Sequence, residues 1–219
     1  MIKIAGFIDH TNLKPAATVQ DIEALCREAV EWRFRTVCVN SANVQIASKL
    51  LSGTGVGVCS VVGFPLGASL SEAKIYEAVK AHDAGASEID MVLNIAWLKQ
   101  GYCDWVEKEI RSLVRAVPDC TVKVILETCL LDDVQKRQGC AIIKSAGAHF
   151  AKTSTGFSST GATVEDIKLM RDALGPDFGV KASGGIRDYE TAAAMIQAGA
   201  NRLGTSNSVA ICKYTEDIC

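Results

Sequence analysis

The sequence lacks any long apolar run. No hydrophobic stretch in its 219 residues approaches the roughly 20 residues that a helix needs to cross a bilayer, and the N-terminus shows no signal-peptide pattern. A formal net charge of −2 gives no electrostatic reason to expect binding to nucleic acid or to an anionic membrane. We therefore expect a cytoplasmic protein with neither a nucleic-acid nor a membrane partner.

The cysteines lack the spacing of a metal site. Nine are scattered along the chain, and none forms a C-x-x-C pair. A zinc site is poorly supported as a result, and we expect no metal. An odd number of thiols without a signal peptide indicates a reducing compartment.

Apolar runs of strand length alternate with segments of helical period along the whole chain. The predicted strands are Ile2–Asp9, Thr36–Asn40, Val56–Val62, Glu88–Asn94, Val122–Thr128, His149–Thr155, Gly179–Gly185 and Arg202–Ser206. The predicted helices are Val19–Trp32, Ser71–His82, Asp104–Ala116, Asp132–Ala146, Val164–Leu174 and Tyr189–Ala198. We expect one domain over residues 1–219.

Local signals mark the ends of these helices. Residues that cap helix starts are Thr18, Ser71, Thr163 and Asp188, and the pair Ser69 and Glu72 fits a capping box. Ala-Gly-Ala at 84–86, 146–148 and 198–200 ends three helical segments. Eight strand–helix units predict an α/β protein, a (β/α)8 TIM barrel; a doubly wound open sheet of six or seven strands is the alternative.

Alternate residues of a barrel strand face opposite sides, and the side toward the helices should be apolar. In 88–94, Ile89, Met91 and Leu93 form the apolar set, which leaves Asp90 facing the interior. The same reasoning places further polar side chains inside: Cys38, Lys123, Glu127, Lys181 and Ser183. The alternation is less clear in 149–155, because the large apolar side chain of Phe150 shares a face with Lys152. We still place Lys152 inside the barrel, because a lysine buried beneath a helix would be less favourable.

Charged side chains inside a barrel are costly unless paired, so several of them indicate chemistry there. Lys152, Lys181 and Asp90 lie toward the C-terminal ends of their strands, where the active sites of such barrels open. A lysine nucleophile must be a free amine, which burial and a second cation both favour. The two lysines would favour that form in each other, and Asp90 would move protons. Spacing does not decide which lysine is the nucleophile, and a lysine that extends its ammonium group to solvent is the structural alternative.

The remaining interior groups are interpreted as support. Lys123 opens its strand and is read as structural or solvated. Glu127 either orients a neighbour through a charge-assisted hydrogen bond or pairs with an interior lysine. Asp9 either lies behind the catalytic groups or caps the loop after its strand. Cys38 is expected to face inward near the substrate, in support of the catalytic groups. A packed thiol is the default for it, and a role in oxidation or aldehyde trapping is the alternative.

We expect no catalytic histidine. His10, His82 and His149 share no spacing and suggest no partner.

Glycine-rich strand ends predict a phosphate site. Gly184-Gly185 follows the strand of Lys181, and Gly204-Thr205-Ser206 ends the last strand. Loops after strands seven and eight of such barrels commonly bind phosphate through backbone N–H groups. Thr155-Gly156 would complete the cup, although a tight turn alone also explains a Gly-Gly pair.

Several motifs together resemble the deoxyribose-phosphate aldolase family along nearly the whole chain. They are DHT and LKP in 9–15, VCVN at 37–40, VGFPLG at 62–67, EIDMV at 88–92, KTSTGF at 152–157, KASGGIR at 181–187 and RLGTS at 202–206. Two departures stand out: Asn207-Ser208 where the family often has Ser-Gly, and Ile95-Ala96-Trp97 in place of a smaller pattern.

The resemblance implies a metal- and cofactor-independent enzyme that reversibly cleaves 2-deoxyribose 5-phosphate to glyceraldehyde 3-phosphate and acetaldehyde. It implies that Lys152 forms a Schiff base while Lys181 and Asp90 donate and accept protons. It also implies a phosphate site at Gly156, Gly184, Gly185 and Ser206, to which we add Thr155 and Asn207, and a homodimer or homotetramer.

Two other functions remain open from the sequence. One is a phosphate-binding barrel isomerase or synthase that works without a Schiff base. The other is a non-catalytic protein that binds phosphorylated sugars.

Overall fold

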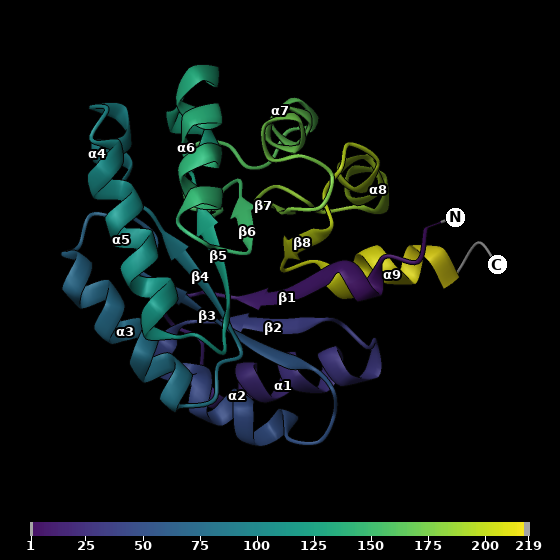
Figure 1. Ribbon diagram of the computed structural model, residues 1–219. Coiled ribbons are helices and arrows are strands. Elements are labelled where there is room, and N and C mark those ends of the chain that lie inside the picture. The colour runs from purple at the N-terminus through teal and green to yellow at the C-terminus, as the bar shows by residue number, and fades with distance from the viewer. Residues whose placement is uncertain (1, 217–219) are drawn as a thin grey trace.

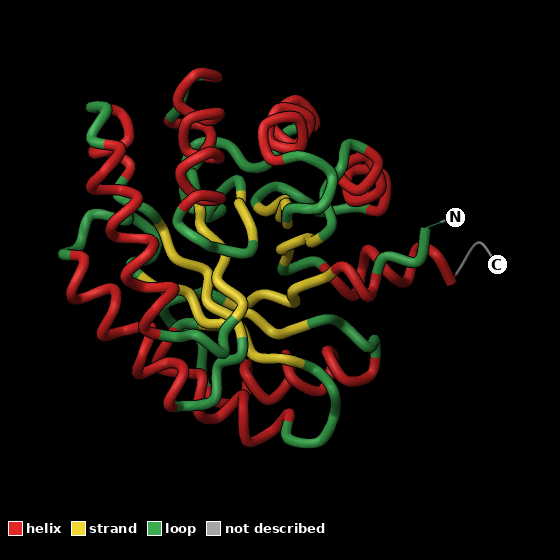
Figure 2. Tube along the Cα trace, viewed as in Figure 1, coloured by secondary structure: helices red, strands yellow, loops and turns green. Residues whose placement is uncertain are grey.

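The computed structural model describes residues 2–216; Met1 and residues 217–219, which include Cys219, lie outside this range. Eight parallel strands pair in sequence order, and the last pairs with the first, so the sheet closes into a barrel. Figure 2 shows the strands at the centre and the helices around them. The predicted (β/α)8 barrel is confirmed, and the open sheet is wrong.

The strands are short and the helices follow them in turn (Figure 1). The strands are β1 (Ile8–Asn12), β2 (Thr36–Val39), β3 (Gly57–Val62), β4 (Glu88–Val92), β5 (Thr121–Ile125), β6 (Phe150–Lys152), β7 (Gly179–Ser183) and β8 (Arg202–Thr205). The helices are α1 (Val19–Glu31), α2 (Val44–Leu51), α3 (Ser71–Asp83), α4 (Ile95–Lys99), α5 (Cys103–Ala116), α6 (Asp133–Ser145), α7 (Val164–Leu174), α8 (Tyr189–Gln197) and α9 (Ser208–Glu216). None of the helices within residues 2–216 has the length and apolar character needed to cross a bilayer.

Most of the predicted helix caps are confirmed. Thr18 forms a capping box with Asp21, and the side chains of Thr163 and Asp188 each accept a backbone N–H of the following turn. The predictions for α3 are wrong: Ser71 is its first helical residue, Leu70 is the N-cap, and the Ser71 hydroxyl donates to Glu109 instead, 3.0 Å away. The helices α2, α4 and α9 were not predicted; the first two have only eight and five residues.

Strand parity separates two apolar clusters. Residues such as Ile89, Val124 and Val180 point outward into the large core beneath the helices. A smaller cluster lies apart from it and is formed by Leu13, Cys38, Cys59 and Val61, with Phe64 packed against it. The inward and outward sets predicted from alternation are therefore confirmed for these strands.

Phe150 resolves the unclean parity of β6. The Arg202 guanidinium lies over its ring, 5.4 Å from the centroid. A Cβ atom at Gly179 would lie only 2.3 Å from that ring, so the glycine provides the space. Phe150 therefore packs against Gly179 of β7 and Arg202 of β8, two residues before Lys152, and both side chains share a face as the alternation requires.

The first strand begins later than predicted. Ala5–Phe7 form a 3-10 turn and β1 starts at Ile8, so Asp9 lies inside the strand and not at its end. Asp9 is paired in register with Thr36 on one side and Gly204 on the other. Its fully buried carboxylate bonds Lys181 and Arg202, so the alternative that it caps a loop is wrong.

Candidate active site

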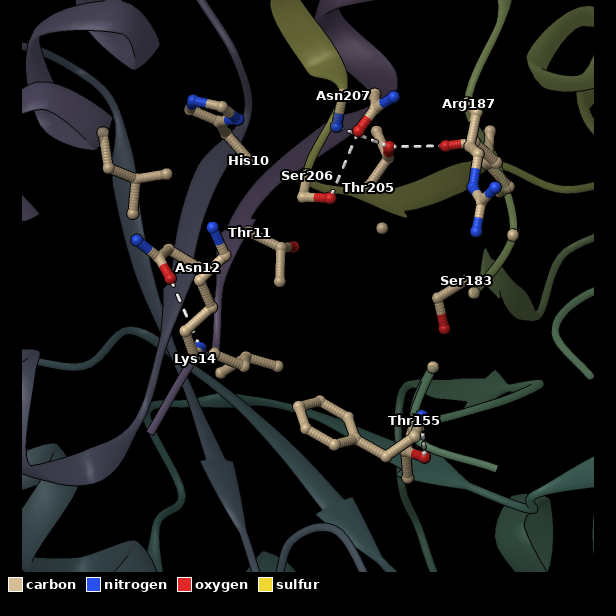
Figure 3. Close-up of a pocket in the computed structure, with 18 of the residues that line it drawn as sticks. His10, Thr11, Asn12, Lys14, Thr155, Ser183, Arg187, Thr205, Ser206 and Asn207 are labelled. Carbon is tan, nitrogen blue, oxygen red and sulfur yellow. Dashed lines mark hydrogen bonds between the residues drawn. The ribbon is translucent and has the colours of Figure 1, made fainter. Parts of the chain in front are cut away.

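A cavity of about 420 Å³ opens at the carboxyl ends of β1, β6, β7 and β8. Figure 3 shows Thr11, Asn12 and Lys14 along one wall and Thr155 and Ser183 across from them, with Ser206 and Asn207 between Thr11 and Arg187. Because strand ends from distant parts of the sequence meet here, this is where a barrel assembles a site.

Lys152 is the last residue of β6 and lines this cavity. It pairs in register with Lys181 on β7, which confirms the matching depth predicted for the two lysines. Lys181 is fully buried and is not among the residues that line the cavity. The two lysines therefore differ in their access to a ligand.

Asp90 is the centre of a buried ionic cluster. Its carboxylate accepts hydrogen bonds from Lys123 at 2.8 Å and from Lys152 and Lys181 at 2.7 Å each. The Cys59 thiol donates a fourth bond at 3.1 Å. Burial by itself would raise the pKa of Asp90, but Lys123, Lys152 and Lys181 hold that pKa well below its usual value.

Lys123 is not solvated, and that alternative is wrong. Its side chain is fully buried, with Nζ 2.5 Å from Glu88 and 2.8 Å from Asp90. It is the third of the five residues of β5 and pairs in register with Phe150, so it lies inside the strand and does not open it. The alternative prediction, that Lys123 has a structural role, agrees with these buried ion pairs.

The buried carboxylates keep Lys123 and Lys181 charged. Burial lowers the pKa of Lys181, but Asp9 and Asp90 raise it further, so the net shift is upward. The pKa of Lys123 is raised well above its usual value, because Asp90 and other anionic groups outweigh the effect of burial. Both groups are therefore ammonium cations at neutral pH.

Cys38 and Cys59 lie opposite each other on β2 and β3 and face inward. Together with Asp90 they form a buried group whose potential ligand atoms lie within 4.8 Å of one another. The ammonium groups of Lys123 and Lys181 already bond Asp90, and their positive charge opposes a metal cation at this place. Cys38 is buried behind the cavity and does not line it.

Glu127 orients the loop after β6 through hydrogen bonds, which is the first of the two roles predicted for it. Its carboxylate accepts the Thr155 hydroxyl at 2.5 Å and the Thr155 backbone N–H at 3.2 Å. The Thr155 hydroxyl oxygen in turn accepts the Phe157 N–H at 3.0 Å. Thr155 lines the cavity, and these bonds fix the backbone that leads into Gly156.

The glycines predicted for a phosphate site meet at one side of the cavity. Gly156, Gly184 and Gly185 all line it together with Ser206 and Asn207. Gly184 has φ of +84°, and a Cβ atom there would lie 3.0 Å from the Gly161 Cα and 3.3 Å from the Gly156 Cα. The loops after β6 and β7 can approach this closely only because the residue is glycine.

The loops after β7 and β8 each lead into the N-terminus of a helix. The loop after β7 leads to α8, and α9 begins at Ser208 directly after Asn207. The Asn207 N–H donates to the Thr205 hydroxyl at 3.0 Å. Backbone N–H groups at helix N-termini favour anions.

His10 was dismissed from the sequence, yet it lines the cavity and has two polar partners. Its Nδ1 lies 2.8 Å from the Ser208 hydroxyl, and its Nε2 lies 2.7 Å from Glu28. Burial lowers the pKa of His10, and Glu28 partly offsets this. Only the barrel closure, which brings β1 beside β8, reveals the link from His10 to the start of α9.

Residues 3–213 match the family model described as DeoC/LacD family aldolase. The chain belongs to this family of aldolases. It is 58% identical to a deoxyribose-phosphate aldolase of Caldanaerobacter subterraneus subsp. tengcongensis, over 96% of this chain and 93% of that protein. A second deoxyribose-phosphate aldolase, from Natranaerobius thermophilus, is 57% identical over 96% of each chain.

Solved structures of the aldolase family share this fold. A putative deoxyribose-phosphate aldolase from Coccidioides immitis superposes with a TM-score of 0.95 at 44% identity, covering 98% of this chain and 86% of the other. The deoxyribose phosphate aldolase from Aeropyrum pernix, described as having a unique tetrameric structure, gives a TM-score of 0.92 at 35% identity, covering 99% and 92%. The resemblance read from the sequence motifs is confirmed.

Proposed function

We propose that this aldolase reversibly cleaves 2-deoxy-D-ribose 5-phosphate to D-glyceraldehyde 3-phosphate and acetaldehyde, with Lys152 as the Schiff-base lysine. The observation that carries this assignment is access: among the three lysines bonded to Asp90, Lys152 alone lines the cavity. Relatives more than half identical over nearly the whole chain carry the matching name.

The chemistry begins at the aldehyde carbon of the open-chain sugar. The free amine of Lys152 adds to C1, and loss of water gives an iminium ion. Removal of the proton from the C3 hydroxyl then breaks the C2–C3 bond. C3 becomes the aldehyde of glyceraldehyde 3-phosphate, and the C2–C3 electron pair becomes the enamine of acetaldehyde.

Protonation of the enamine carbon and addition of water release acetaldehyde and restore the amine. We assign these proton transfers to Asp90 and Lys181, which are 2.7 Å apart and of which Asp90 also bonds Lys152. A carboxylate and an ammonium in one hydrogen-bonded chain supply an acceptor and a donor without solvent. Asp9, Cys38 and Glu127 hold this chain and its surroundings and do not touch the substrate.

The phosphate is assigned to the side of the cavity formed by the loops after β6, β7 and β8. Gly156, Gly184 and Gly185 offer close-approaching backbone, and Ser206 and Asn207 offer polar groups ahead of α9. Thr155 acts through its bonds to Glu127, which shape the approach to Gly156.

Reductive trapping tests the assignment. Acetaldehyde and borohydride should leave a reduced two-carbon adduct on Lys152, located by peptide mass spectrometry, and Lys152→Arg should abolish it. Tight binding of the phosphorylated sugar without turnover would favour the non-catalytic alternative. Turnover without any adduct would favour an isomerase or synthase, and an adduct on Lys181 alone would overturn the choice of lysine.

We further propose one domain over residues 1–219, a cytoplasmic location and a homo-oligomeric state. The oligomer is suggested by the tetrameric relative from Aeropyrum pernix.

A further inference from the structure

The buried charges inside the barrel form a closed cycle of alternating sign. Each member contacts the next through a salt bridge, and we call the cycle the charge ring: Arg202, Glu88, Lys123, Asp90, Lys181, Asp9 and back to Arg202. Its three cations and three carboxylates cancel. The charge ring is therefore electrically neutral without Lys152.

Each cation of the charge ring lies between two carboxylates. Arg202 reaches Glu88 at 3.0 Å and Asp9 at 2.7 Å, and Lys123 reaches Glu88 at 2.5 Å and Asp90 at 2.8 Å. Lys181 bonds both Asp9 and Asp90. Two anionic partners bind a proton strongly, so these cations stay charged.

Lys152 differs because it is attached to the charge ring at one point only. Its ammonium reaches Asp90 at 2.7 Å, and no second carboxylate is bonded to it within the described residues. When Lys152 is protonated, the buried cluster carries one excess positive charge; when it is the free amine, the cluster is neutral. Charges buried together interact strongly, so a change in the net charge of the ring acts on the side chain that is attached to it.

We propose that Glu88 and Arg202 are positioning residues that set the protonation state of Lys152 by fixing the net charge of the charge ring. Neither residue lines the cavity. They are the first residues of β4 and β8, at the end of the barrel away from the opening, and their side chains are each only 7% exposed. This inference rests on the proposed role of Lys152 and extends it to residues with no contact to substrate.

Charged and titratable groups outside the charge ring also lie around Lys152. They are Cys38 on β2, Cys59 on β3 and Glu127 after β5, with His10, Lys14, Asp21, Glu28 and Arg187 lining the same cavity. Burial raises the pKa of Cys59 well above its usual value, so that thiol stays protonated, whereas the hydrogen bond with Cys59 lowers the pKa of Cys38. None of these groups is changed by the substitutions that test the proposal. Glu127 is engaged by Thr155, at the mouth and outside the charge ring.

The test uses two substitutions of opposite sign in the full-length protein. Glu88→Gln leaves an excess positive charge, so Lys152 should lose its proton more readily. The acid limb of the pH profile, measured as the rate of trapping by acetaldehyde and cyanoborohydride at Lys152, should move to lower pH by about one unit, a tenfold change in free amine at a fixed acidic pH. Arg202→Met leaves an excess negative charge and should move the same limb to higher pH by a similar amount.

Two further variants separate charge from shape. The double variant Glu88→Gln, Arg202→Met is neutral again, and its acid limb should return toward the wild-type position. Arg202→Lys keeps the charge and should stay close to wild type in pH profile. Asp83→Asn, which removes an exposed carboxylate paired with Lys80, serves as the matched control and should leave the profile in place.

The outcomes are distinguishable. The inference is overturned if the acid limbs of the two single variants move in the same direction, if neither limb moves, or if the double variant lies further from wild type than the single variants do. A purely structural role would lower the rate without moving the limb in opposite directions. If near-ultraviolet circular dichroism shows that one single variant does not fold, the acid limb of the other single variant is compared with that of the double variant, and this comparison tests the same point. Absence of an adduct on wild-type Lys152 refutes the proposed function instead.

Discussion

Three lysines bond the same carboxylate, but their surroundings give them different chemistry. Lys123 and Lys181 each have a second carboxylate partner and are fully buried, whereas Lys152 has Asp90 alone and faces the cavity. A residue type therefore predicts little by itself here. The number of anionic partners and the access to the cavity distinguish the two buried cations, Lys123 and Lys181, from the lysine that we propose as the nucleophile.

Lys181→Leu is predicted to lower the rate of sugar cleavage by about 100-fold or more at neutral pH, because it removes the proposed proton donor. It also leaves the charge ring with one excess negative charge, so the acid limb of the pH profile should move upward. Steady-state kinetics between acidic and alkaline pH would measure both effects. Lys80→Met, at an exposed lysine on α3, is the matched control; a Lys181 variant with wild-type rate and profile would contradict the assignment.

Asp9→Asn is predicted to lower the free energy of unfolding at neutral pH by on the order of 2 kcal/mol or more. Burial raises the pKa of Asp9, but Lys181, Lys123 and Arg202 lower it to about 2. A carboxylate whose pKa is lower in the folded state than in the unfolded chain, where it is about 4, stabilises the folded state at pH values above about 4. This stability is lost as the pH falls toward about 2. Urea titrations at several pH values should show the gap between wild type and variant narrowing below about pH 4; a constant gap would argue against the ion pairs as its cause.

At the scale of elements, the segments after β6 and β7 are joined by the hydroxyl groups of Thr153 and Ser183 and, further along the loops, by close backbone contacts. The Ala162 N–H donates to the carbonyls of Ser183 and Gly184 at 3.1 and 3.0 Å. Gly161 sits against Gly184 so closely that a Cβ at 161 would lie 2.0 Å from the Gly184 carbonyl oxygen. Any added side chain in this contact moves the loops that line the cavity.

Gly184→Ala is predicted to raise KM for the phosphorylated sugar while lowering kcat less, because it displaces the backbone assigned to the phosphate. It should also cost about 1–2 kcal/mol of stability through its positive φ. Gly175→Ala is the matched control, since Gly175 has φ of +82° but nothing within 4 Å of its Cβ position. Kinetics and thermal unfolding of both variants would separate strain from site geometry; an equal rise in KM in both would sink the phosphate assignment of Gly184.

The sequence predicted elements well where local patterns decide them. Alternation in 88–92 identified Asp90 as inward, and Thr18, Thr163 and Asp188 marked helix starts, because both signals depend on neighbouring residues. Ser71 has the residue type of a cap, but Glu109 on α5 offers its hydroxyl a buried acceptor instead. Tertiary partners of this kind are invisible to local spacing.

The site shows the same division. The positions of Lys152, Lys181 and Asp90 followed from strand register, but the charge ring did not, because Glu88 and Arg202 are 114 residues apart and meet only across the closed barrel. His10 had no apparent partner until closure placed β1 beside β8 and Ser208 within reach. Long-range pairings thus account for most of what the sequence could not supply.

At the scale of the whole molecule, closure between β1 and β8 joins the two ends of the described chain. Ile2 N–H donates to the Tyr189 hydroxyl at 3.0 Å, and the Tyr189 ring stacks on Tyr214 of α9. Figure 1 shows β1 and α9 on the same side of the molecule. The N-terminal segment with β1 and the C-terminal elements β8 and α9 are therefore packed together as one part of the barrel.

We predict that the protein in solution is a homo-oligomer, a dimer or a tetramer. Light scattering coupled to size-exclusion chromatography over a dilution series would give a mass two or four times that of one chain. A mass of one chain at every concentration would contradict the expectation drawn from the tetrameric relative.

The charge ring also bears on how such a catalyst can be copied. A designer who grafts only a lysine, an aspartate and a second lysine onto another barrel keeps the same net charge, but deprives the aspartate of its Lys123 partner and the second lysine of its Asp9 partner. The natural arrangement keeps four more interior charges, two of them on the first residues of β4 and β8. The smallest transplantable unit is accordingly the seven-residue set of the charge ring and Lys152, and its members should tolerate exchange only in compensating pairs.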